Sequence, residues 1–341
     1  MSGAAGDAPR RQFLCGDAVK RLRGLPEASI DCVITSPPYW AQRDYGVAGQ
    51  IGAEPTVQGW VTELVGVAAE LRRVLKPGGA LWLNIGDGYS RHPREGAPRK
   101  SLLLGPQRLA VALQEDGWLV RNNVIWAKRN AMPSSVTDRL SCSHETILLL
   151  TQQPTYYFDL DAIRVPATTP RHSGRATQRA VYPPPAAAPQ LHGSPRIDLN
   201  RGLASLKAAG QESHPLGKNP GDAWLLPTAA YRGAHFAVFP LDLVRRPLLA
   251  TCPERLCTGC GVPWRRAQQR VNGRLLASGP LRAGCDCGGD WRPGIVLDPF
   301  MGAGTVALVA EQERRDWLGI ELNPAYVELA QARLAQARGH P

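Results

Sequence analysis

Short apolar runs alternate along the chain with segments whose apolar residues recur at helical spacing. Strands are predicted for residues 13–15, 28–34, 80–85, 122–127, 146–150, 295–298 and 317–320, and helices for residues 60–75, 105–116, 241–249 and 306–311. Residues 156–158 are predicted as the second arm of a hairpin that begins with 146–150. Such an alternation is typical of an α/β fold in which helices connect mostly parallel strands.

This pattern stops after Val165. Residues 166–222 are rich in Pro, Gly, Ser and Ala, carry more basic than acidic side chains and show no sustained periodicity. The segment is either a disordered linker or an insert that recognises nucleic acid, because Arg and Lys supply contacts to phosphates and to guanine. We therefore divide the chain into residues 1–165, an insert at 166–232 and residues 233–341.

The chain carries a formal net charge of +11, which favours a polyanionic partner. No run approaches the roughly 18 apolar residues of a membrane span, and no signal-peptide core follows the polar N-terminal segment. These features predict a cytoplasmic protein without a membrane partner. In that compartment the eight cysteines are not expected to form a disulfide framework.

Five of these cysteines crowd within residues 252–290. One pair has CxxC spacing followed by glycine, and a second pair has tighter CxC spacing. Four thiolates suit a tetrahedral zinc ion, and a closed four-thiolate site leaves no position for a substrate. We expect a structural zinc ribbon in this segment, with Cys252 as an alternative ligand. The predicted ligands are Cys257, Cys260, Cys285 and Cys287.

The strand at 28–34 leads into Ser36, Pro37, Pro38 and Tyr39. The prolines carry no N–H, so this stretch offers carbonyl acceptors on a stiff, extended path. Tyr39 adds a flat ring beside those acceptors. A ring beside convergent acceptors can hold an extruded nucleobase by its face and bind its exocyclic amine. A Pro-Pro turn with a packed tyrosine explains the bare tetrapeptide equally well.

A second motif begins where the strand at 295–298 ends in Asp298. A Gly-x-Gly turn at Gly302 and Gly304 follows and opens a helix. Glycines in such a turn let a ligand approach the backbone closely, and the absence of a third glycine favours a nucleoside without phosphates over a dinucleotide. The next strand ends in Glu321, about 20 residues further on, where a carboxylate can accept hydrogen bonds from ribose hydroxyls.

The sequences LCGD, TSPPYW, HFAVFP, DPFMGAGT and GIELNP resemble the motifs of DNA amino-methyltransferases that use S-adenosylmethionine, in the order of the permuted beta group. The resemblance covers nearly the whole chain outside residues 166–222. It implies a Rossmann-like, mostly parallel seven-stranded sheet with circularly permuted motif order, a catalytic role for the Ser36 tetrapeptide and target recognition by 166–232. It implies that the cofactor is held by Asp17, Phe239, Pro240, Asp298, Phe300, Gly302, Gly304, Thr305 and Glu321. Members of this family do not in general require a zinc ribbon.

The first residue of the tetrapeptide bears on the base that is methylated. In the family that the chain resembles, adenine-N6 enzymes usually carry Asp or Asn there and cytosine-N4 enzymes usually carry Ser. Ser36 therefore predicts transfer to cytosine N4 in duplex DNA, by base flipping and direct displacement. The alternatives are adenine N6, RNA or a protein glutamine amide as the substrate, and a zinc-ribbon nucleic-acid-binding protein without turnover. Candidate protein partners are a second copy of the chain and a restriction endonuclease.

Overall fold

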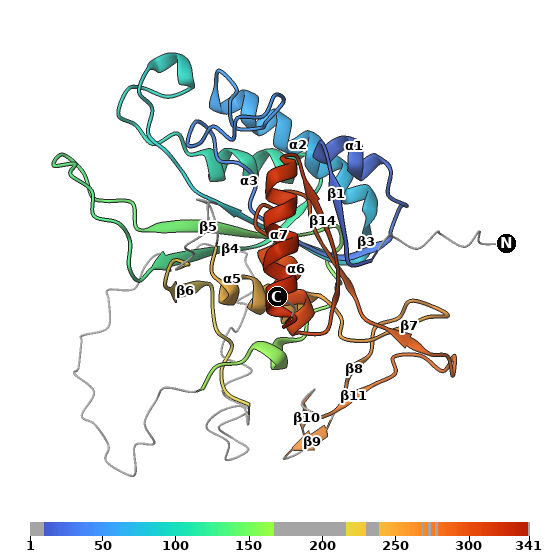
Figure 1. Ribbon diagram of the computed structural model, residues 1–341. Coiled ribbons are helices and arrows are strands. Elements are labelled where there is room, and N and C mark those ends of the chain that lie inside the picture. Colours follow the sequence, from blue (N-terminus) through green and yellow to red (C-terminus); the bar gives the residue numbers. More distant parts are fainter. Residues whose placement is uncertain are drawn as a thin grey trace, which may run out of the picture.

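The computed structural model describes residues 10–166, 216–229, 239–267, 269–271, 274–276 and 279–339. Its centre is an eight-stranded sheet with helices on both faces (Figure 1). Most of the predicted insert at 166–232 and the first part of the HFAVFP motif lie outside the described residues. No helix in the described ranges is long and apolar enough to cross a membrane.

Every neighbouring pair of strands in this sheet is parallel, except the two pairs that β5 makes. The mostly parallel sheet is thus confirmed, but it has eight strands instead of seven, because the short β6 adds beside β4. The strands lie in the order β1 (Gln12–Cys15), β14 (Asp316–Glu321), β13 (Ile295–Asp298), β2 (Ile30–Thr35), β3 (Leu75–Ile85), β5 (His144–Thr151), β4 (Leu119–Lys128) and β6 (Ala223–Leu226).

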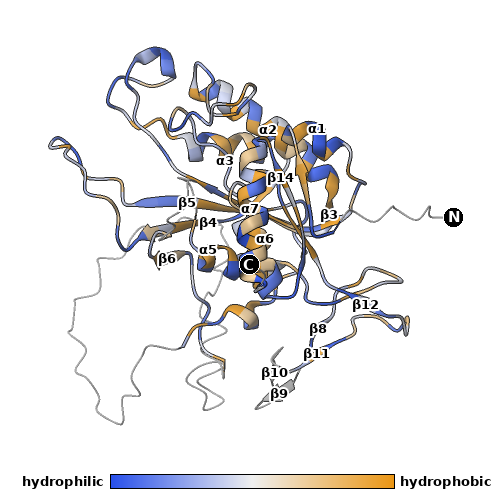
Figure 2. Cartoon of the chain, in the orientation of Figure 1, coloured by the Kyte–Doolittle hydropathy of each residue, from blue (hydrophilic) through white to orange (hydrophobic). Residues whose placement is uncertain are grey.

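The helices divide between two hydrophobic layers, one on each face of the sheet. Strand β2 is buried at every position because both of its faces are covered, and Figure 2 shows the central strands as mainly hydrophobic. One layer contains α1 (Ala18–Arg23), α2 (Val57–Val74) and α3 (Gly105–Glu115); the other contains α5 (Leu241–Thr251), α6 (Thr305–Gln312) and α7 (Pro324–Ala337). Two short 3-10 helices, η1 (Pro93–Glu95) and η2 (Leu160–Ile163), lie in connections.

The hairpin predicted between 146–150 and 156–158 is wrong. Strand β5 pairs with β3 on one side and with β4 on the other, so neither of its edges is free for a further strand. Instead, the segment that contains Tyr157 crosses near the start of β3. The backbone N–H of Tyr157 donates to the carbonyl of Gly78 in this strand at 3.0 Å. Helix α7 was not among the predicted helices.

The residue just before the predicted insert, Val165, pairs with Lys218, which lies inside the predicted bounds 166–232. The N–H of Val165 donates to the carbonyl of Lys218 at 3.0 Å, and the N–H of Lys218 donates back at 2.8 Å. Gly217 is needed for this approach, because a Cβ atom there would lie 2.2 Å from the carbonyl oxygen of Val165 and its φ is +95°. The chain therefore leaves and re-enters the described fold at one point.

Three small two-stranded sheets separate α5 from β13. They are formed by β7 (Leu256–Cys257) with β12 (Trp291–Arg292), β8 (Arg265–Arg266) with β11 (Leu281–Arg282), and β9 (Gln269–Val271) with β10 (Arg274–Leu276). Figure 1 shows this segment extending from the sheet at the lower right. We call residues 253–293 the ribbon.

Candidate active site

A cavity of about 540 Å³ opens at the carboxyl ends of β1, β2, β13 and β14. Ligands of open parallel sheets bind at this edge, and the volume falls in the range of about 300–1,000 Å³ that is usual for small-molecule sites. The predicted site residues that line the cavity are Asp17, Ser36, Pro37, Pro38, Tyr39, Phe239, Phe300, Gly302, Thr305 and Glu321.

The two principal motifs are spatial neighbours although they lie at opposite ends of the chain. Strand β13 pairs with β2 in parallel, with Val296 opposite Cys32. At the ends of these strands, the Thr35 hydroxyl donates a hydrogen bond of 2.6 Å to Asp298 Oδ1. The tetrapeptide and the Gly-x-Gly turn therefore leave adjacent strands and face the same cavity.

A buried hydrogen-bond network fixes the ring of Tyr39. The Tyr39 hydroxyl donates to Glu145 Oε2 at 2.6 Å, while Asn84 Nδ2 donates to both of these oxygens at 2.8 Å. Lys128 Nζ donates to Glu145 Oε1 at 2.6 Å. Burial, together with the Glu145 carboxylate, raises the pKa of Tyr39 well above its ordinary value, so the phenol stays protonated and remains a donor.

Some hydrogen-bond acceptors of the tetrapeptide already receive a hydrogen bond from the protein, and others do not. The indole N–H of Trp60 donates to the carbonyl of Pro38 at 2.9 Å. No hydrogen bond from the described part of the chain reaches the carbonyl of Pro37. At the cavity wall, the Ser36 hydroxyl donates to the Tyr39 hydroxyl at 3.2 Å and accepts from Asn84 Nδ2 at 3.5 Å, which leaves one lone pair of Oγ for a ligand. Ser36 Oγ and the Pro37 carbonyl are thus the acceptors that a bound group can reach.

The opposite wall of the cavity is built around Glu321. Its Oε2 accepts the N–H of Gly302 at 2.8 Å, and its Oε1 accepts the N–H of Asn323 at 2.9 Å. Each carboxylate oxygen has a second lone pair, so capacity remains for a ligand hydroxyl. Burial raises the pKa of Glu321 above its ordinary value, and the backbone N–H donors of Asn323 and Gly302 partly offset this rise.

Three predicted cofactor residues do not line the cavity. Asp298 is only 2% exposed and faces Thr35 and the N–H of Phe300, and burial raises its pKa to about 7. Gly304 forms the turn into α6 at φ +71°, where a Cβ atom would lie 3.0 Å from the side chain of Ala330 in α7. Pro240 precedes α5 as its N-cap residue. Their positions suit support of the cavity wall.

Several residues at the cavity were missed by the sequence analysis, among them Asn84, Trp126, Lys128, Met132, Glu145 and Tyr326. The only signal for Glu145 was its place directly before the apolar run 146–150. Asn84 was hidden inside an apolar run that predicted a strand. Asp17, which was predicted, lines the cavity and also caps α1, because its Oδ1 accepts the N–H of Lys20 at 2.9 Å.

The model of the DNA methylase family, N6_N4_Mtase, matches residues 30–332. The chain belongs to this family. Two bacterial relatives support the assignment over nearly the full length. The type II methyltransferase M.Cfr9I of Citrobacter freundii is 34% identical over 94% of this chain and 86% of its own length. M.SmaI of Serratia marcescens is 33% identical over 96% of this chain and 91% of its own.

Solved structures show the same fold in this family. The PvuII DNA methyltransferase, described as cytosine-N4-specific, has a TM-score of 0.57 and 18% identity over 96% of this chain and 89% of its own. TTHA0409 of Thermus thermophilus, a putative DNA modification methylase solved with S-adenosylmethionine, has a TM-score of 0.51 and 23% identity over 95% of each chain. This protein is accordingly a DNA amino-methyltransferase that uses S-adenosylmethionine.

Proposed function

We propose that this enzyme methylates the N4 amine of cytosine in duplex DNA, at a sequence read by residues 166–232. The observation that carries the proposal is Ser36, which stands at the wall of the cavity as the first residue of the tetrapeptide. Ser is the usual residue there in cytosine-N4 enzymes of the family. The order of the motifs, with TSPPYW before DPFMGAGT, supports a circularly permuted member.

The Glu321 side of the cavity suits the cofactor. S-adenosylmethionine supplies an activated methyl group when it is bound. Glu321 has the free lone pairs to accept ribose hydroxyls, and the backbone at Gly302 allows close approach. Phe300 presents a ring, Thr305 opens α6, and Asp17 and Phe239 close the cavity from other elements. The cofactor side of the cavity is supported by three residues that do not line it, Asp298, Gly304 and Pro240.

The Ser36 side suits the amine that is methylated. An exocyclic amine has two protons, and Ser36 Oγ and the Pro37 carbonyl are two acceptors at adjacent positions. Accepting both protons draws the nitrogen lone pair out of conjugation with the ring and orients it for direct displacement. Because Trp60 already donates to the Pro38 carbonyl, the Pro37 carbonyl, which accepts no hydrogen bond from the described residues, is the better candidate for the second acceptor. The Tyr39 ring offers its face to the base.

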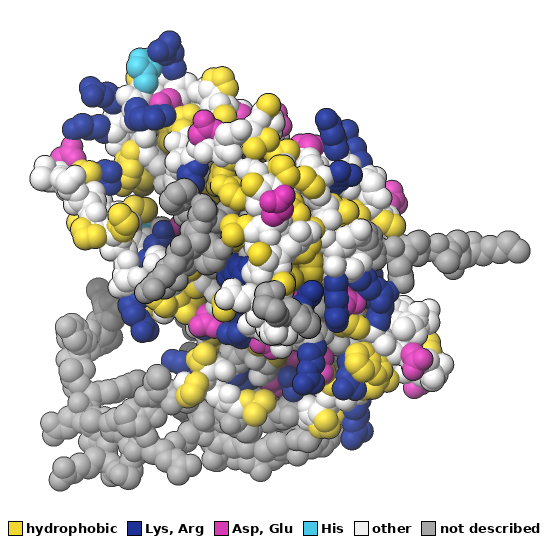
Figure 3. Space-filling model, in the orientation of Figure 1, with side chains coloured by type: hydrophobic (Ala, Val, Ile, Leu, Met, Phe, Trp, Pro, Cys, Tyr) yellow, Lys and Arg dark blue, Asp and Glu magenta, His cyan; other side chains and the backbone are white. Residues whose placement is uncertain are grey.

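The charge of the chain and an exposed apolar residue of the cavity suit the binding of duplex DNA with a flipped nucleotide. Lys and Arg side chains are spread over much of the visible face, with fewer acids between them (Figure 3). Met132 is 86% exposed and belongs to the cavity wall. Apolar side chains at such a rim can fill the gap that an extruded base leaves in the stack. The similarity to type II methyltransferases supports a paired restriction endonuclease.

The test is mass spectrometry of digested DNA after reaction with isotope-labelled cofactor. The expected product is N4-methylcytosine. Label in N6-methyladenine would overturn the choice of base, and label in RNA but not in DNA offered at equal concentration would overturn the substrate. Sequencing the modified positions in a host that expresses the chain identifies the recognition sequence. Replacing residues 166–232 by the same segment of a relative should then move that sequence.

A further inference from the structure

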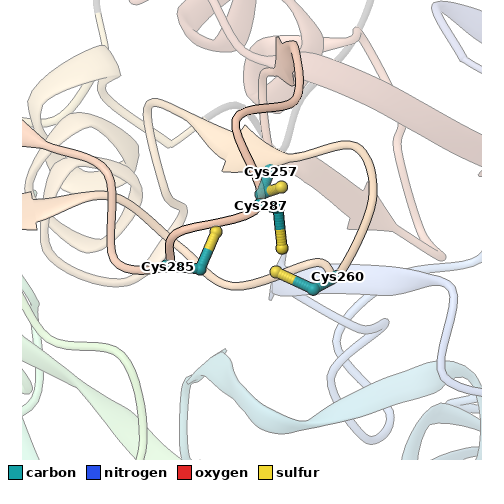
Figure 4. A group of neighbouring side chains, drawn as sticks. All are labelled: Cys257, Cys260, Cys285 and Cys287. Atoms are coloured by element: carbon teal, nitrogen blue, oxygen red, sulfur yellow. The ribbon is translucent and has the colours of Figure 1, made fainter.

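The structure brings four cysteines of the ribbon together. Their sulfur atoms all lie within 4.8 Å of one another, and Figure 4 shows them facing a common centre. Thiolates at the Zn–S distance of about 2.3 Å stand roughly 3.8 Å apart in a tetrahedron, so small side-chain shifts suffice to enclose one ion. Cys252 is not in this group and is fully buried, with Cys32 among its neighbours, so it is excluded as an alternative ligand.

The backbone around these cysteines has the form of two matched metal-binding turns. Each pair is followed by a glycine in the left-handed region, Gly261 at φ +69° and Gly288 at φ +61°. Backbone N–H groups of each turn are directed at the first sulfur of the pair, Cys257 in one and Cys285 in the other. Outer hydrogen bonds of this kind orient and stabilise thiolate ligands.

Little else in the described ribbon can hold it folded. Its paired strands β7, β8, β11 and β12 have two residues each. Trp291 is 47% exposed and, with Trp264, packs on the guanidinium of Arg255 at 4.6 and 5.0 Å instead of entering a core. Segments of this size without a core are held by disulfides or by metal.

The position of the ribbon rules out a part in the methyl transfer. Strand β12 ends at Arg292, only a few residues before β13 begins at Ile295. The ribbon therefore joins the sheet at the amino end of β13, whereas the cavity lies at the carboxyl end. A metal ion held by four thiolates at this edge is structural.

Among the described residues of the ribbon, two ion pairs attach it to the rest of the fold. Arg292 Nη1 lies 3.3 Å from Oδ2 of the buried Asp31. Arg266 Nε donates to both carboxylate oxygens of Asp159 at 2.8 and 3.0 Å. The backbone N–H of Asp159 is bonded to the carbonyl of Ala250 at the end of α5. Asp159 lies six positions before Val165, where the insert departs.

We propose that the four cysteines bind one Zn²⁺ and that the resulting ribbon fixes the segment 156–165, the base of the insert, through Arg266 and Asp159. The ligands are Cys257, Cys260, Cys285 and Cys287. The ion sets the paths of β8 and β11, and hence the position of the Arg266 guanidinium. This proposal does not depend on which base is methylated.

The metal is tested by elemental analysis of full-length protein purified without chelator. We expect about one zinc per chain in the wild type and in the control Cys15→Ser, whose cysteine is exposed outside the ribbon. Cys260→Ser should hold little zinc. Iron in place of zinc, or well under one metal ion per wild-type chain, would overturn the zinc site. The wild-type measurement decides this even where Cys260→Ser fails to fold.

The anchor is tested by hydrogen exchange of the zinc-loaded protein. Arg266→Ala should accelerate exchange in peptides that cover 157–165 by about fivefold, as expected for an ion pair worth about 1 kcal/mol. Arg265→Ala is the matched control, because the neighbouring side chain is exposed, and it should leave these peptides unchanged. Peptides covering 295–321 should be unaffected in both variants. Unchanged exchange at 157–165 in Arg266→Ala would refute the anchor.

Discussion

The Tyr39 hydroxyl donates to Glu145 Oε2 at 2.6 Å and so joins the exit of β2 to the start of β5 across 106 positions of sequence. The same carboxylate also accepts hydrogen bonds from Asn84 and Lys128. The Glu145 carboxylate therefore accepts hydrogen bonds from three side chains, those of Tyr39, Asn84 and Lys128. It holds the tyrosine of the tetrapeptide in one orientation while Lys128 balances its charge.

Glu145→Gln should lower kcat by roughly ten- to hundredfold, corresponding to about 1.5–3 kcal/mol for a lost hydrogen bond to a charged group. The amide keeps the shape of the side chain but removes the charge opposite Lys128. Affinity for S-adenosylmethionine, measured by calorimetry, should change less than about twofold, because Glu145 lies on the side of the cavity away from Glu321. Glu115→Gln, at an exposed position of α3, is the control. Equal losses of kcat in the two variants would contradict this role.

Ser36→Ala should reduce kcat by about 10²–10³-fold, the usual cost of removing one preorganised polar group from a reacting centre. Cofactor affinity should be nearly intact, because the hydroxyl is proposed to contact the amine and not the cofactor. Single-turnover rates and calorimetry on the same preparation measure the two effects. A loss of cofactor affinity without a loss of kcat would contradict a contact between Ser36 and the reacting amine.

Glu321→Ala should weaken S-adenosylmethionine binding by about 1–3 kcal/mol, or roughly 5- to 150-fold in Kd. The variant removes the carboxylate proposed to accept the ribose hydroxyls. Glu328→Ala, on the exposed side of α7, serves as the control. Unaltered calorimetric affinity in Glu321→Ala would reject the proposed cofactor side of the cavity.

Asp298 should make the stability of the protein depend on pH. Its pKa is raised by burial from 3.8 to about 7, so the folded state holds a proton that the unfolded state releases at lower pH. Its contribution to stability is therefore present at about pH 4 and is lost as the pH rises towards 7. Asp298→Asn, which stays neutral, should gain stability relative to the wild type over this range. Denaturant unfolding of both proteins from pH 4.5 to 8 measures the difference in their free energies of unfolding. A difference that does not change with pH would contradict the prediction.

Met132→Ala should lower kcat/KM on a fully paired target by about five- to tenfold, because an apolar wedge no longer fills the stack behind the flipped base. The loss should shrink on a target whose base is mismatched, since less stacking is broken there. Leu140→Ala is the matched control: it is 89% exposed on the same β4–β5 connection but does not line the cavity. Equal effects of Met132→Ala on paired and mismatched targets would reject the wedge.

The site residues that could be predicted from the sequence lie in contiguous motifs directly after predicted strands. The tetrapeptide and the Gly-x-Gly turn are contiguous and follow strands with a clear apolar pattern, so their place at the carboxyl edge follows from chain direction. Glu145 and Lys128 reach the site through the antiparallel pairing of β5 with β4, in which Trp126 lies opposite Glu145. Because a long connection and not a short turn joins β4 to β5, no turn signal in the sequence fixes the register of this pair. The short β6 was missed for the same reason.

The backbone bridge between Val165 and Lys218 also bears on how such enzymes diversify. Where the ends of a segment are already joined, doubling the length between them changes the closure entropy by only about 0.6 kcal/mol. Insertions, deletions and wholesale exchange between those two residues are therefore tolerated by the sheet. Since residues 166–232 are proposed to read the DNA sequence, such an exchange would give a lineage a new DNA specificity in one genetic step, while the proposed cofactor-binding and catalytic residues are inherited unchanged.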